Sequence, residues 1–394
     1  MKILHCSDIH LGKRPFGTKE FTQKRYLDFF NAFDQLIEKG IEENIELFIV
    51  AGDLFDKKEL TPDVLRRCEK SFEKLKKHNI SSFIIEGNHD NINENDLINS
   101  WTNYLEKKNL LVRGNYIYEN GKYEFDKFKI KDLNIYGLGY PGFAVDDVIK
   151  NLAEIVNPEE KNIVVVHTAL GGGDYLPGLV SSDAIKMLEG KVIYIAGGHL
   201  HSYQSYPKNN PYFFIPGSSE YWNVLNEKSD IKGGIIFDTE TLEHNFIPIA
   251  PRTRIKVTFN AQNRDNISEE FEMFCQNLNL TGEELVITDV LLNENGYVDV
   301  SELEKILETN GALKGYIELK YPQKTDGSLN NKGYYSVKDV EKSIIESWDI
   351  FKNSDSVAEY LQKFKEYQED KDREEDFYNL FDQMLEEELT DEDK

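Results

Sequence analysis

Carboxylate, amide and imidazole side chains recur in this sequence directly after short apolar runs. In LFIVAGDLFD, residues 47–56, the apolar run ends at Gly52 and Asp53 follows at once. This pattern is typical of a buried β-strand, and open α/β sheets bind their ligands beyond the carboxyl ends of strands. Other strand-like runs end in the same way and supply further candidates: Asp8 and His10, Asn88 and His89, His167, and His199 and His201.

Most of these side chains form one set of candidate metal ligands: Asp8, His10, Asp53, Asn88, His167, His199 and His201. Oxygen and nitrogen ligands without a thiolate suit divalent first-row metals such as Mn²⁺, Fe²⁺ or Zn²⁺. Two such ions roughly 3.5–4 Å apart can share one carboxylate and activate water for in-line attack on phosphorus. We therefore expect two divalent metal ions at the strand ends, with Asp53 as the bridging carboxylate.

The net charge limits how the chain could bind a polyanion. Of its 394 residues, 40% are hydrophobic and 30% charged, and the formal net charge is −25. Residues 354–394 carry 16 acidic and 5 basic side chains, so they contribute −11 of this total. The composition argues against a protein that binds nucleic acid through its overall charge. A polyanionic substrate would have to be held by metals and local basic patches.

Cysteine usage and hydropathy bear on the compartment. Cys6, Cys68 and Cys275 are isolated and odd in number, which fits a reducing compartment and excludes a zinc-ribbon or disulfide framework. No apolar run reaches membrane-spanning length, and a cleaved signal peptide would remove Asp8. We expect a cytoplasmic protein.

Residues 1–250 alternate strand and helix signals, which predicts a layered α/β fold with helices outside one sheet or two facing sheets. Helical spacing of apolar residues marks 27–37, 64–75 and 97–105. Thr61 and Pro62 are expected to begin the second helix, which runs to about residue 78. The third is expected over about 94–108. The segments YFFIPGS and GGIIFD resemble an antiparallel pair.

Pro251 marks a change of pattern. Residues 254–321 predict the order strand, helix, strand, helix, strand, and the second helix is expected to begin in a capping box of Ser301 and Glu304 and to end before Gly311. These residues contribute no candidate ligand and indicate a small separate domain. Residues 324–335 form a polar linker, and 336–394 contain amphipathic helical segments in an acidic tail.

Five motifs carry a family resemblance. SDIHLG, GDLFD, EGNHD, VVHT and GGHLH are similar to the motifs of the calcineurin-like metallophosphoesterases. HCSDIHLG and GDLFD resemble one branch, the DNA double-strand-break repair nucleases of the Mre-eleven/SbcD family. The resemblance covers residues 1–250 by motif and the rest by architecture. It implies a layered metallophosphoesterase sheet sandwich flanked by helices (1–250), a small α+β capping domain (251–323), a linker (324–335) and partner-binding helices with an acidic tail (336–394).

The resemblance also implies a role for each site residue. The first metal would be bound by Asp8, His10, Asp53 and His201. The second metal would be bound by Asp53, Asn88, His167 and His199. Two further residues would be catalytic: His89 would assist the leaving oxygen, and Asp90 would orient His89 through a hydrogen bond. A turn histidine is the alternative for His89. Some members carry histidine where this chain has Asp56, so a second catalytic histidine is not expected at that position.

Three surfaces are candidates for partners. Basic residues within 57–77 and at 107–108 would contact the DNA backbone, or form an ordinary solvated helix face. Helices around Leu65 and Leu97–Leu105 would form a homodimer interface, or pack in the core. An apolar stripe in the tail favours docking into a groove. The resemblance implies an SbcC-type coiled-coil ABC ATPase as its partner, and docking on the chain itself is the alternative. The stripe consists of Val357, Tyr360, Leu361, Phe364, Phe377, Leu380, Phe381, Met384 and Leu385.

The combined hypothesis is a Mn²⁺-dependent DNA exonuclease and endonuclease that works with this ATPase in double-strand-break repair. A small-molecule phosphodiesterase acting on cyclic nucleotides is one alternative, although it would not need the extra domain or the partner helices. A non-catalytic DNA-repair scaffold is another, and the convergent ligand set argues against it.

Overall fold

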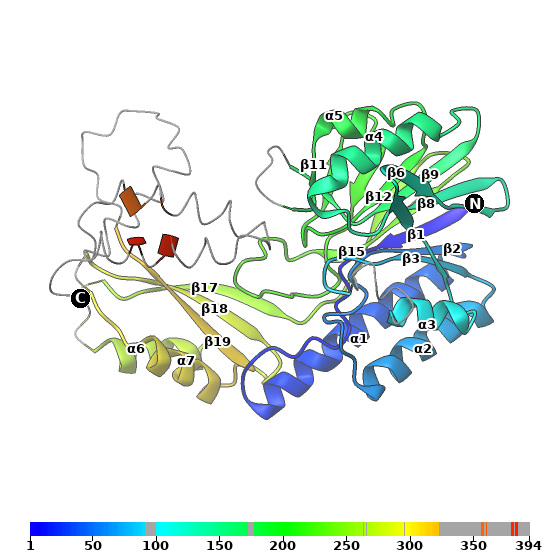
Figure 1. Ribbon diagram of the computed structural model, residues 1–394. Coiled ribbons are helices and arrows are strands. Elements are labelled where there is room, and N and C mark those ends of the chain that lie inside the picture. The colour runs from blue at the N-terminus through cyan, green and yellow to red at the C-terminus, as the bar shows by residue number, and fades with distance from the viewer. Residues whose placement is uncertain are drawn as a thin grey trace. The chain divides into compact units, whose positions relative to one another are not determined.

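The computed structural model describes residues 1–90, 100–171, 177–262, 264, 266–294 and 296–322, with 356–357, 360, 380–381 and 383–384. The chain divides into two compact units, Met1–Pro322 and Gln323–Lys394. Every helix and strand named in this description belongs to the first unit (Figure 1). The predicted domain borders at residues 250, 323 and 335 stay predictions.

One six-stranded sheet has the order β16-β15-β1-β2-β3-β4. Strands β1 to β4 run parallel, whereas β15 pairs antiparallel with both β1 and β16. The bounds are β1 (Lys2–Cys6), β2 (Leu47–Ala51), β3 (Ser81–Ile85), β4 (Val112–Arg113), β15 (Lys232–Asp238) and β16 (His244–Ile249).

A second six-stranded sheet has the order β13-β14-β12-β9-β8-β7. Its four central strands run parallel and both edge strands are antiparallel. The bounds are β7 (Lys127–Ile130), β8 (Leu133–Gly137), β9 (Lys161–Val166), β12 (Tyr194–Gly197), β13 (Gln204–Tyr206) and β14 (Phe213–Ile215).

The two sheets face each other and helices cover both outer faces (Figure 1). Alternate residues of each strand point to opposite faces. Ile49 and Val165 therefore lie in the core between the sheets, while Val50 and Val166 pack beneath helices. The helices are α1 (Lys19–Glu42), α2 (Pro62–Lys77) and α3 (Trp101–Lys107) on the first sheet, and α4 (Val145–Ile155) and α5 (Ser182–Lys186) on the second. The expected sandwich flanked by helices is confirmed.

Five short elements lie outside the two large sheets. They are β5 (Tyr116–Glu119), β6 (Lys122–Phe125), β10 (Ala169–Leu170), β11 (Leu179–Val180) and the 3₁₀ helix η2 (Gly142–Ala144).

Residues 254–320 form a three-stranded parallel sheet with two crossover helices. Its elements are β17 (Arg254–Asn260), α6 (Ile267–Gln276), β18 (Leu285–Leu291), α7 (Val300–Thr309) and β19 (Lys314–Lys320), in the predicted order. The expected capping box is wrong. The N-cap of α7 is Asp299, whose carboxylate accepts the backbone N–H groups of Ser301 and Glu302.

The predicted pairing of YFFIPGS with GGIIFD is also wrong. Strand β14 pairs with β12 and β13 in the second sheet, whereas β15 pairs with β1 and β16 in the first. Residues 216–231 cross from one sheet to the other between them. This crossing segment is long enough to change layers, and local alternation cannot distinguish it from a hairpin loop.

The third helix begins at Trp101, with Ser100 as its N-cap. Residues 91–99, including Leu97, lie outside the described part of the chain. Leu105 is fully buried in the core, and Leu65 and Trp101 are partly buried against it. Core packing therefore accounts for Leu105, and the homodimer stays a prediction.

Several of the helix cations expected to contact DNA have carboxylate partners. Arg66 and Arg67 pair with Asp63, and Lys108 pairs with Glu69. Exposed ion pairs of this kind are usual for solvated helix faces. DNA contact by these helices stays a prediction.

Five of the nine residues of the predicted tail stripe are described. Val357, Tyr360 and Met384 are buried, Leu380 is half-buried and Phe381 is exposed. Leu361, Phe364, Phe377 and Leu385 lie outside the described residues. Among the residues that are described, none belongs to a helix long and apolar enough to cross a membrane.

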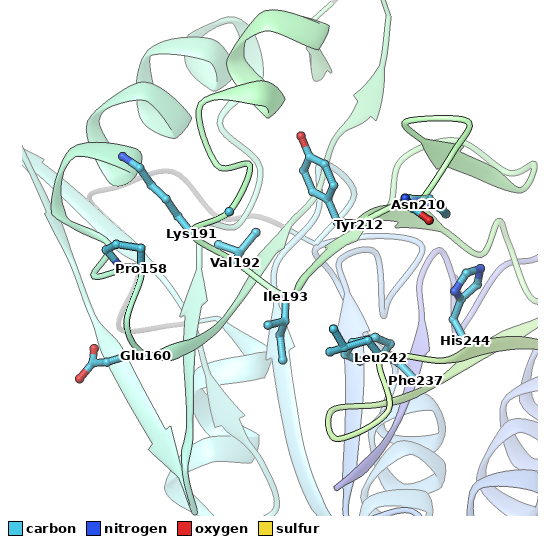
Figure 2. Close-up of a pocket in the computed structure, with 12 residues that line it drawn as sticks. Pro158, Glu160, Lys191, Val192, Ile193, Asn210, Tyr212, Phe237, Leu242 and His244 are labelled. Atoms are coloured by element: carbon cyan, nitrogen blue, oxygen red, sulfur yellow. The ribbon is translucent and has the colours of Figure 1, made fainter.

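A hollow of about 580 Å³ opens where strands β9, β12 and β14 begin (Figure 2). Its labelled side chains include Ile193, Tyr212, Leu242 and His244. The strand starts lie at the opposite edge from the strand ends, so this hollow is separate from the candidate metal ligands.

Candidate metal centre

The parallel strands bring every candidate ligand to one edge of the sandwich. Asp8 and His10 follow β1, Asp53 follows β2 and Asn88 follows β3; in the second sheet, His167 follows β9, and His199 and His201 follow β12. Parallel neighbours end at the same edge of a sheet. The two facing sheets therefore present their ligands to each other across that edge.

Four of the candidates have a left-handed backbone. The φ angles are 53° for Asp8, 51° for His10, 53° for Asp53 and 84° for His199. Such conformations are rare outside glycine and persist where the surrounding structure enforces them, often at functional sites. Here the loops brace each other, because the backbone N–H groups of residues 9 and 10 both donate to the carbonyl of Asp53, at 2.9 and 3.0 Å.

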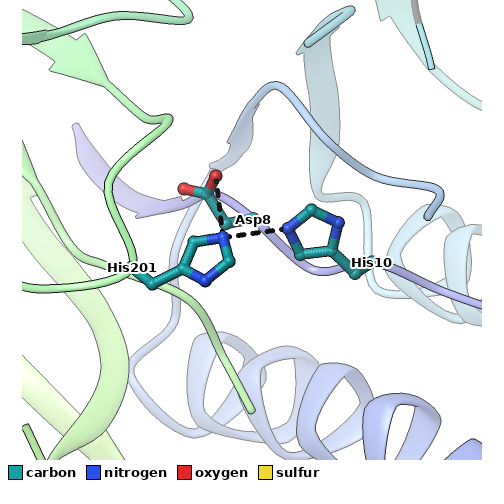
Figure 3. Close-up of side chains that lie close together, drawn as sticks. All are labelled: Asp8, His10 and His201. Carbon is teal, nitrogen blue, oxygen red and sulfur yellow. Dashed lines mark hydrogen bonds and ion pairs between the residues drawn. The ribbon is translucent and has the colours of Figure 1, made fainter. Parts of the chain in front are cut away.

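One group of donors comprises Asp8, His10 and His201 (Figure 3). The Nε2 atoms of His10 and His201 face each other at 3.2 Å, and His201 Nε2 lies 3.9 Å from Asp8 Oδ1. Two imidazole nitrogens this close to each other, beside a carboxylate oxygen, can bind the same cation. The backbone N–H of His199 donates to both Asp8 oxygens, at 3.1 and 3.2 Å, which fixes the carboxylate.

A second group comprises Asn88, His167 and His199. The Asn88 Oδ1 atom lies 3.1 Å from His167 Nε2 and 3.0 Å from His199 Nδ1. Asp53 joins this group to the first, since its Oδ2 atom lies 3.4 Å from His167 Nε2 and 3.9 Å from His10 Nε2. One carboxylate oxygen thus reaches both groups, which is the placement expected of a bridging ligand.

These residues fit divalent cations. In each of three overlapping groups, the donor atoms lie within 4.8 Å of one another: Asp8, His10 and His201; His10, Asp53 and His89; and Asp8, Asp53 and His167. A cation with ligand bonds of about 2.0–2.2 Å holds its ligand atoms at most about 4.4 Å apart. The donor separations of 3.2 Å, 3.4 Å and 3.9 Å given above lie within this limit. His10 Nδ1 is buried without a hydrogen-bond partner among the described residues. The donor atoms of this ligand set are nitrogen and oxygen only. The thiol of Cys6, two residues before Asp8, donates to the carbonyl of Ile49 instead of joining the set.

Burial and charge perturb this cluster strongly. Burial lowers the pKa of His10 well below its usual value and that of His199 to about 4. Burial also acts on His167, but the charge of Asp53 outweighs it and raises the pKa of His167 to about 9. Burial alone would raise the pKa of the Asp53 carboxyl. The neighbouring His167 outweighs burial and holds this pKa below its usual range. Opposed pKa shifts within one cluster of side chains are typical of functional sites.

His89 lies at the same centre. Its ring centroid is 4.7 Å from that of His10, and its backbone N–H donates to Asp53 Oδ1 at 2.9 Å. Nδ1 lies 2.9 Å from the carbonyl oxygen of Asp56, so Nδ1 carries the proton and Nε2 faces away from that carbonyl. His89 is within ligand distance of His10 and Asp53, and its assignment as a non-ligand rests on the family resemblance.

The expected hydrogen bond from Asp90 to His89 is wrong. Both oxygens of Asp90 accept backbone N–H groups, from Gly87 at 2.6 Å and Phe55 at 3.2 Å. Asp90 is buried, and burial raises its pKa well above the usual value. Asp90 therefore ties the loop after β3 to the loop after β2, and the Asp56 carbonyl holds the His89 ring.

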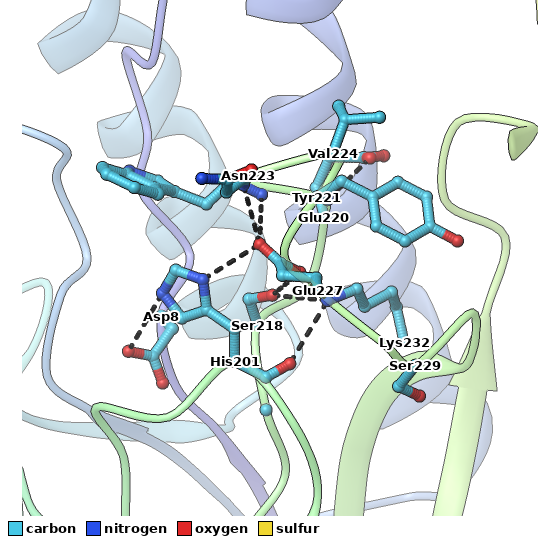
Figure 4. Close-up of polar contacts among 12 residues, drawn as sticks. Asp8, His201, Ser218, Glu220, Tyr221, Asn223, Val224, Glu227, Ser229 and Lys232 are labelled. Carbon is cyan, nitrogen blue, oxygen red and sulfur yellow. Dashed lines mark hydrogen bonds and ion pairs between the residues drawn. The ribbon is translucent and has the colours of Figure 1, made fainter. Parts of the chain in front are cut away.

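Glu227 is a site residue that the sequence did not reveal (Figure 4). Its Oε1 atom lies 3.0 Å from His201 Nδ1 and accepts the backbone N–H groups of Trp222 and Asn223 at 2.8 Å. Its Oε2 atom pairs with buried Lys232. Burial by itself would raise the pKa of Glu227, but the hydrogen bond with His201 and the charge of Lys232 lower it to about 2. Glu227 lies in a loop segment without periodicity, so no local signal marks it.

Two aromatic rings flank the centre. Trp222 lies 5.6–5.9 Å from the rings of His10, His89 and His201. Tyr140 lies 5.9 Å from His167 and 5.6 Å from His199. The Trp222 Nε1–H donates to Asp56 Oδ1 at 2.7 Å, so Asp56 anchors this ring.

Comparison with known proteins gives relatives along most of the chain. It is 26% identical to a DNA double-strand break repair protein Mre11 of Methanococcus maripaludis, over 98% of this chain and 95% of that protein. A protein of the same description from Sulfolobus acidocaldarius is 26% identical over 81% of each chain. A subunit of the nuclease SbcCD from Staphylococcus epidermidis is 22% identical, over 88% of this chain and 96% of that protein.

Some relatives are longer and some are more distant. Matches to the Mre11 proteins of two Methanosarcina species cover 79% of this chain but 49% of theirs. A dimetal phosphatase structure from Danio rerio aligns with 60% of this chain and 91% of that one, at 10% identity and a TM-score of 0.40.

A family model described as calcineurin-like phosphoesterase matches residues 1–203. These residues include β1, β2, β3, β9 and β12, with every candidate ligand at their ends. The match spans more than half of the chain, and the protein belongs to the calcineurin-like phosphoesterase family.

Proposed function

We propose that this protein is a Mn²⁺-dependent DNA nuclease, with exonuclease and endonuclease activity, that processes double-strand breaks with a coiled-coil ABC-type ATPase. The observation that carries the proposal is the convergence of Asp8, His10, Asp53, Asn88, His167, His199 and His201 on one edge of the sandwich. The named relatives, which match over most of the chain, support DNA as the substrate.

In this proposal the site residues act as follows. Two divalent cations held by the ligand set would polarise the phosphate and make water a nucleophile at neutral pH. Asp53 would supply its carboxylate to both cations, since its Oδ2 atom lies near both His10 and His167. His89 keeps its Nδ1 proton on the Asp56 carbonyl, so its Nε2 would first take a proton from water and then give that proton to the departing oxygen. Asp90 and Asp56 hold His89 in place, the first by bonding backbone N–H groups and the second through its carbonyl.

We propose that residues 1–250 form the nuclease domain and 251–323 the capping domain, followed by the linker at 324–335. Residues 336–394 would dock on the ATPase, and the protein would act as a homodimer in the cytoplasm. The apolar stripe in the acidic tail supports the docking part of this proposal.

The test uses end-labelled linear duplex DNA and bis-p-nitrophenyl phosphate, each with and without Mn²⁺. We expect stepwise, Mn²⁺-dependent shortening of the DNA that is lost in His89→Gln. His78→Gln, at the exposed end of α2, is the matched control and should cleave like wild type.

Other outcomes identify the alternatives. Hydrolysis of the small ester with intact DNA would indicate a small-molecule phosphodiesterase. Inactivity on both substrates, with the ATPase added, would indicate a scaffold.

A further inference from the structure

We propose that Lys13 is a substrate-positioning residue whose ammonium group binds a backbone phosphate of the strand lying at the metal centre. This inference rests on the proposed nuclease function and deepens it by naming a side chain that holds the substrate.

The backbone places Lys13 beside the site. Its N–H donates to the carbonyl of His10 at 3.1 Å, which closes a tight turn directly after a candidate ligand. The same segment is held against the loop after β2, because Leu11 and Phe55 form a parallel bridge and Asp56 donates its N–H to the Leu11 carbonyl at 3.1 Å. The position of Lys13 is thus coupled to the loop that carries Asp53.

The side chain folds back along the wall of the centre. Lys13 Nζ lies 3.6 Å from the centroid of the Trp222 ring and 3.4 Å from Asp56 Oδ1. That same oxygen lies 3.9 Å from His10 Nδ1. The Trp222 ring contacts three histidines of the centre, so the ammonium lies one ring away from them.

The ammonium has hydrogen-bonding capacity beyond these contacts. A lysine has three donors and no acceptor, and the face of an indole attracts a cation without using a donor in an ordinary hydrogen bond. Asp56 Oδ1 already accepts the shorter bond from Trp222, at 2.7 Å. The Lys13 side chain keeps 18% of its surface exposed. It can therefore give donors to a phosphate oxygen that enters beside His89.

The surrounding charge favours such a contact. The chain carries a net charge of −25, which repels a polyanion unless cations lie close to the reacting phosphate. Beyond Lys13, Arg14 and Lys19 line a hollow of about 520 Å³ beside the Tyr26 ring. Basic side chains thus continue from the centre through residues 13–19 to the first residue of α1, and Asp63 and Arg67 also line this hollow.

The test measures binding and turnover in the full chain. Affinity for labelled linear DNA is measured in EDTA by fluorescence anisotropy between about 50 and 200 mM salt, and KM and kcat are measured with Mn²⁺. We expect Lys13→Gln to reduce the slope of log K against log salt by about 0.7–0.9, as for one lost phosphate contact. KM for DNA should rise about fivefold to tenfold, with a smaller change in kcat. Lys13→Arg, which keeps the charge, should restore both values.

The matched control is Lys161→Gln, which removes a lysine paired with Asp132 and Glu240 at the start of β9 and should leave the salt slope unchanged. Melting temperatures are recorded for all variants. If Lys13→Gln has a lower melting temperature than wild type, the test is repeated with Lys13→Met, which keeps an apolar side chain against Trp222.

Two results have different meanings. A folded Lys13 variant with wild-type salt slope and KM would overturn the inference and leave the nuclease proposal intact. A wild-type protein that binds DNA through Lys13 but does not cleave it would instead overturn the proposed activity.

Discussion

Three histidines of the candidate centre are each oriented by a partner on Nδ1. Glu227 contacts His201 Nδ1, the carbonyl of Ala51 contacts His167 Nδ1, and the carbonyl of Asp56 contacts His89 Nδ1. A partner on one ring nitrogen selects the tautomer and aims the other nitrogen at the centre. The chemistry therefore depends on residues that are not themselves ligands.

Replacement of Glu227 by Gln should weaken Mn²⁺ binding by about 10- to 100-fold, because the partner of His201 loses its charge. Titration calorimetry measures the affinity. Since Lys232 is buried beside Glu227, the variant should also be less stable, and adding Lys232→Met should recover stability without recovering metal affinity. Glu243→Gln, on an exposed turn, is the control. Unchanged Mn²⁺ affinity in Glu227→Gln would contradict this role.

A second prediction at the residue scale concerns His5 and the pH dependence of the free energy of unfolding. Its ring nitrogens contact Tyr194 Oη and the Gly197 carbonyl, each at 2.9 Å, and burial lowers its pKa from 6.5 to about 3. Below pH 6.5 the unfolded chain binds a proton that the folded chain does not. The contribution of neutral His5 to the free energy of unfolding is therefore complete above pH 6.5. It is lost as the pH falls toward 3, by up to about 1.4 kcal/mol per pH unit.

Urea unfolding of wild type and His5→Gln at several pH values checks this expectation. The variant should be less stable at neutral pH, and its free energy of unfolding should fall less steeply between pH 6.5 and 4. His78→Gln is the matched exposed control. Parallel curves for wild type and His5→Gln would show that His5 does not titrate in this window.

At the scale of single elements, the strand ends leave no room for larger residues. Gly52 lies between β2 and Asp53 with φ at +91°, and a Cβ atom there would meet the ring of His167 from the other sheet. Gly121, in the β5–β6 turn, also has a positive φ of +76°, but a Cβ atom there would meet nothing within 4 Å. Substitutions at these two glycines therefore distinguish the cost of a left-handed backbone, common to both, from the cost of a steric clash, which only Gly52 would have.

Gly52→Ala should therefore cost more than Gly121→Ala. The left-handed backbone alone costs about 1–2 kcal/mol in both variants. Only Gly52→Ala should also displace His167, lower Mn²⁺ affinity and reduce phosphoesterase activity at least tenfold, as a misplaced reacting group does. Chemical denaturation and bis-p-nitrophenyl phosphate turnover measure the two effects. Equal losses in the two variants would exclude a steric role for Gly52.

At the scale of the whole first unit, buried charges join residues 251–322 to the metal centre. Arg25 is fully buried and bonds Asp28, Glu220 and the carbonyl of Tyr221, at 2.8, 3.0 and 2.6 Å. Arg252 bonds Asp28 through its guanidinium and Glu220 through its backbone N–H. Glu220 lies two residues before Trp222, which flanks the metal centre. This network of buried charges therefore connects residues 251–322 with the segment beside that centre.

Arg25→Met should destabilise the protein by about 3–5 kcal/mol, because it leaves buried carboxylates with fewer partners. Amide hydrogen exchange should show the loss of protection concentrated in residues 216–231 and 251–260. Arg66→Met, which removes one exposed partner of Asp63, should cost at most about 1 kcal/mol. A uniform loss of protection along the chain would contradict a coupling role for this network.

The sequence by itself determined which residues could do chemistry. Apolar runs followed by Asp, Asn or His predicted the strands, and parallel strands of one sheet share their carboxyl edge, so the gathering of Asp8 and Asp53 follows from local pattern and general topology. His167 joins them from the other sheet, and that approach depends on how the two sheets stack. The order of elements in 254–320 was predictable for the same reason, because each helix and strand there carries its own period.

Only the tertiary structure decided which groups support those residues. Glu227, Trp222 and Lys13 reach the centre from loops without periodicity, the partners of Asp90 are backbone groups, and β15 joins β1 from more than two hundred residues away. Contacts between segments so far apart depend on how layers stack, and no short window of sequence records that stacking.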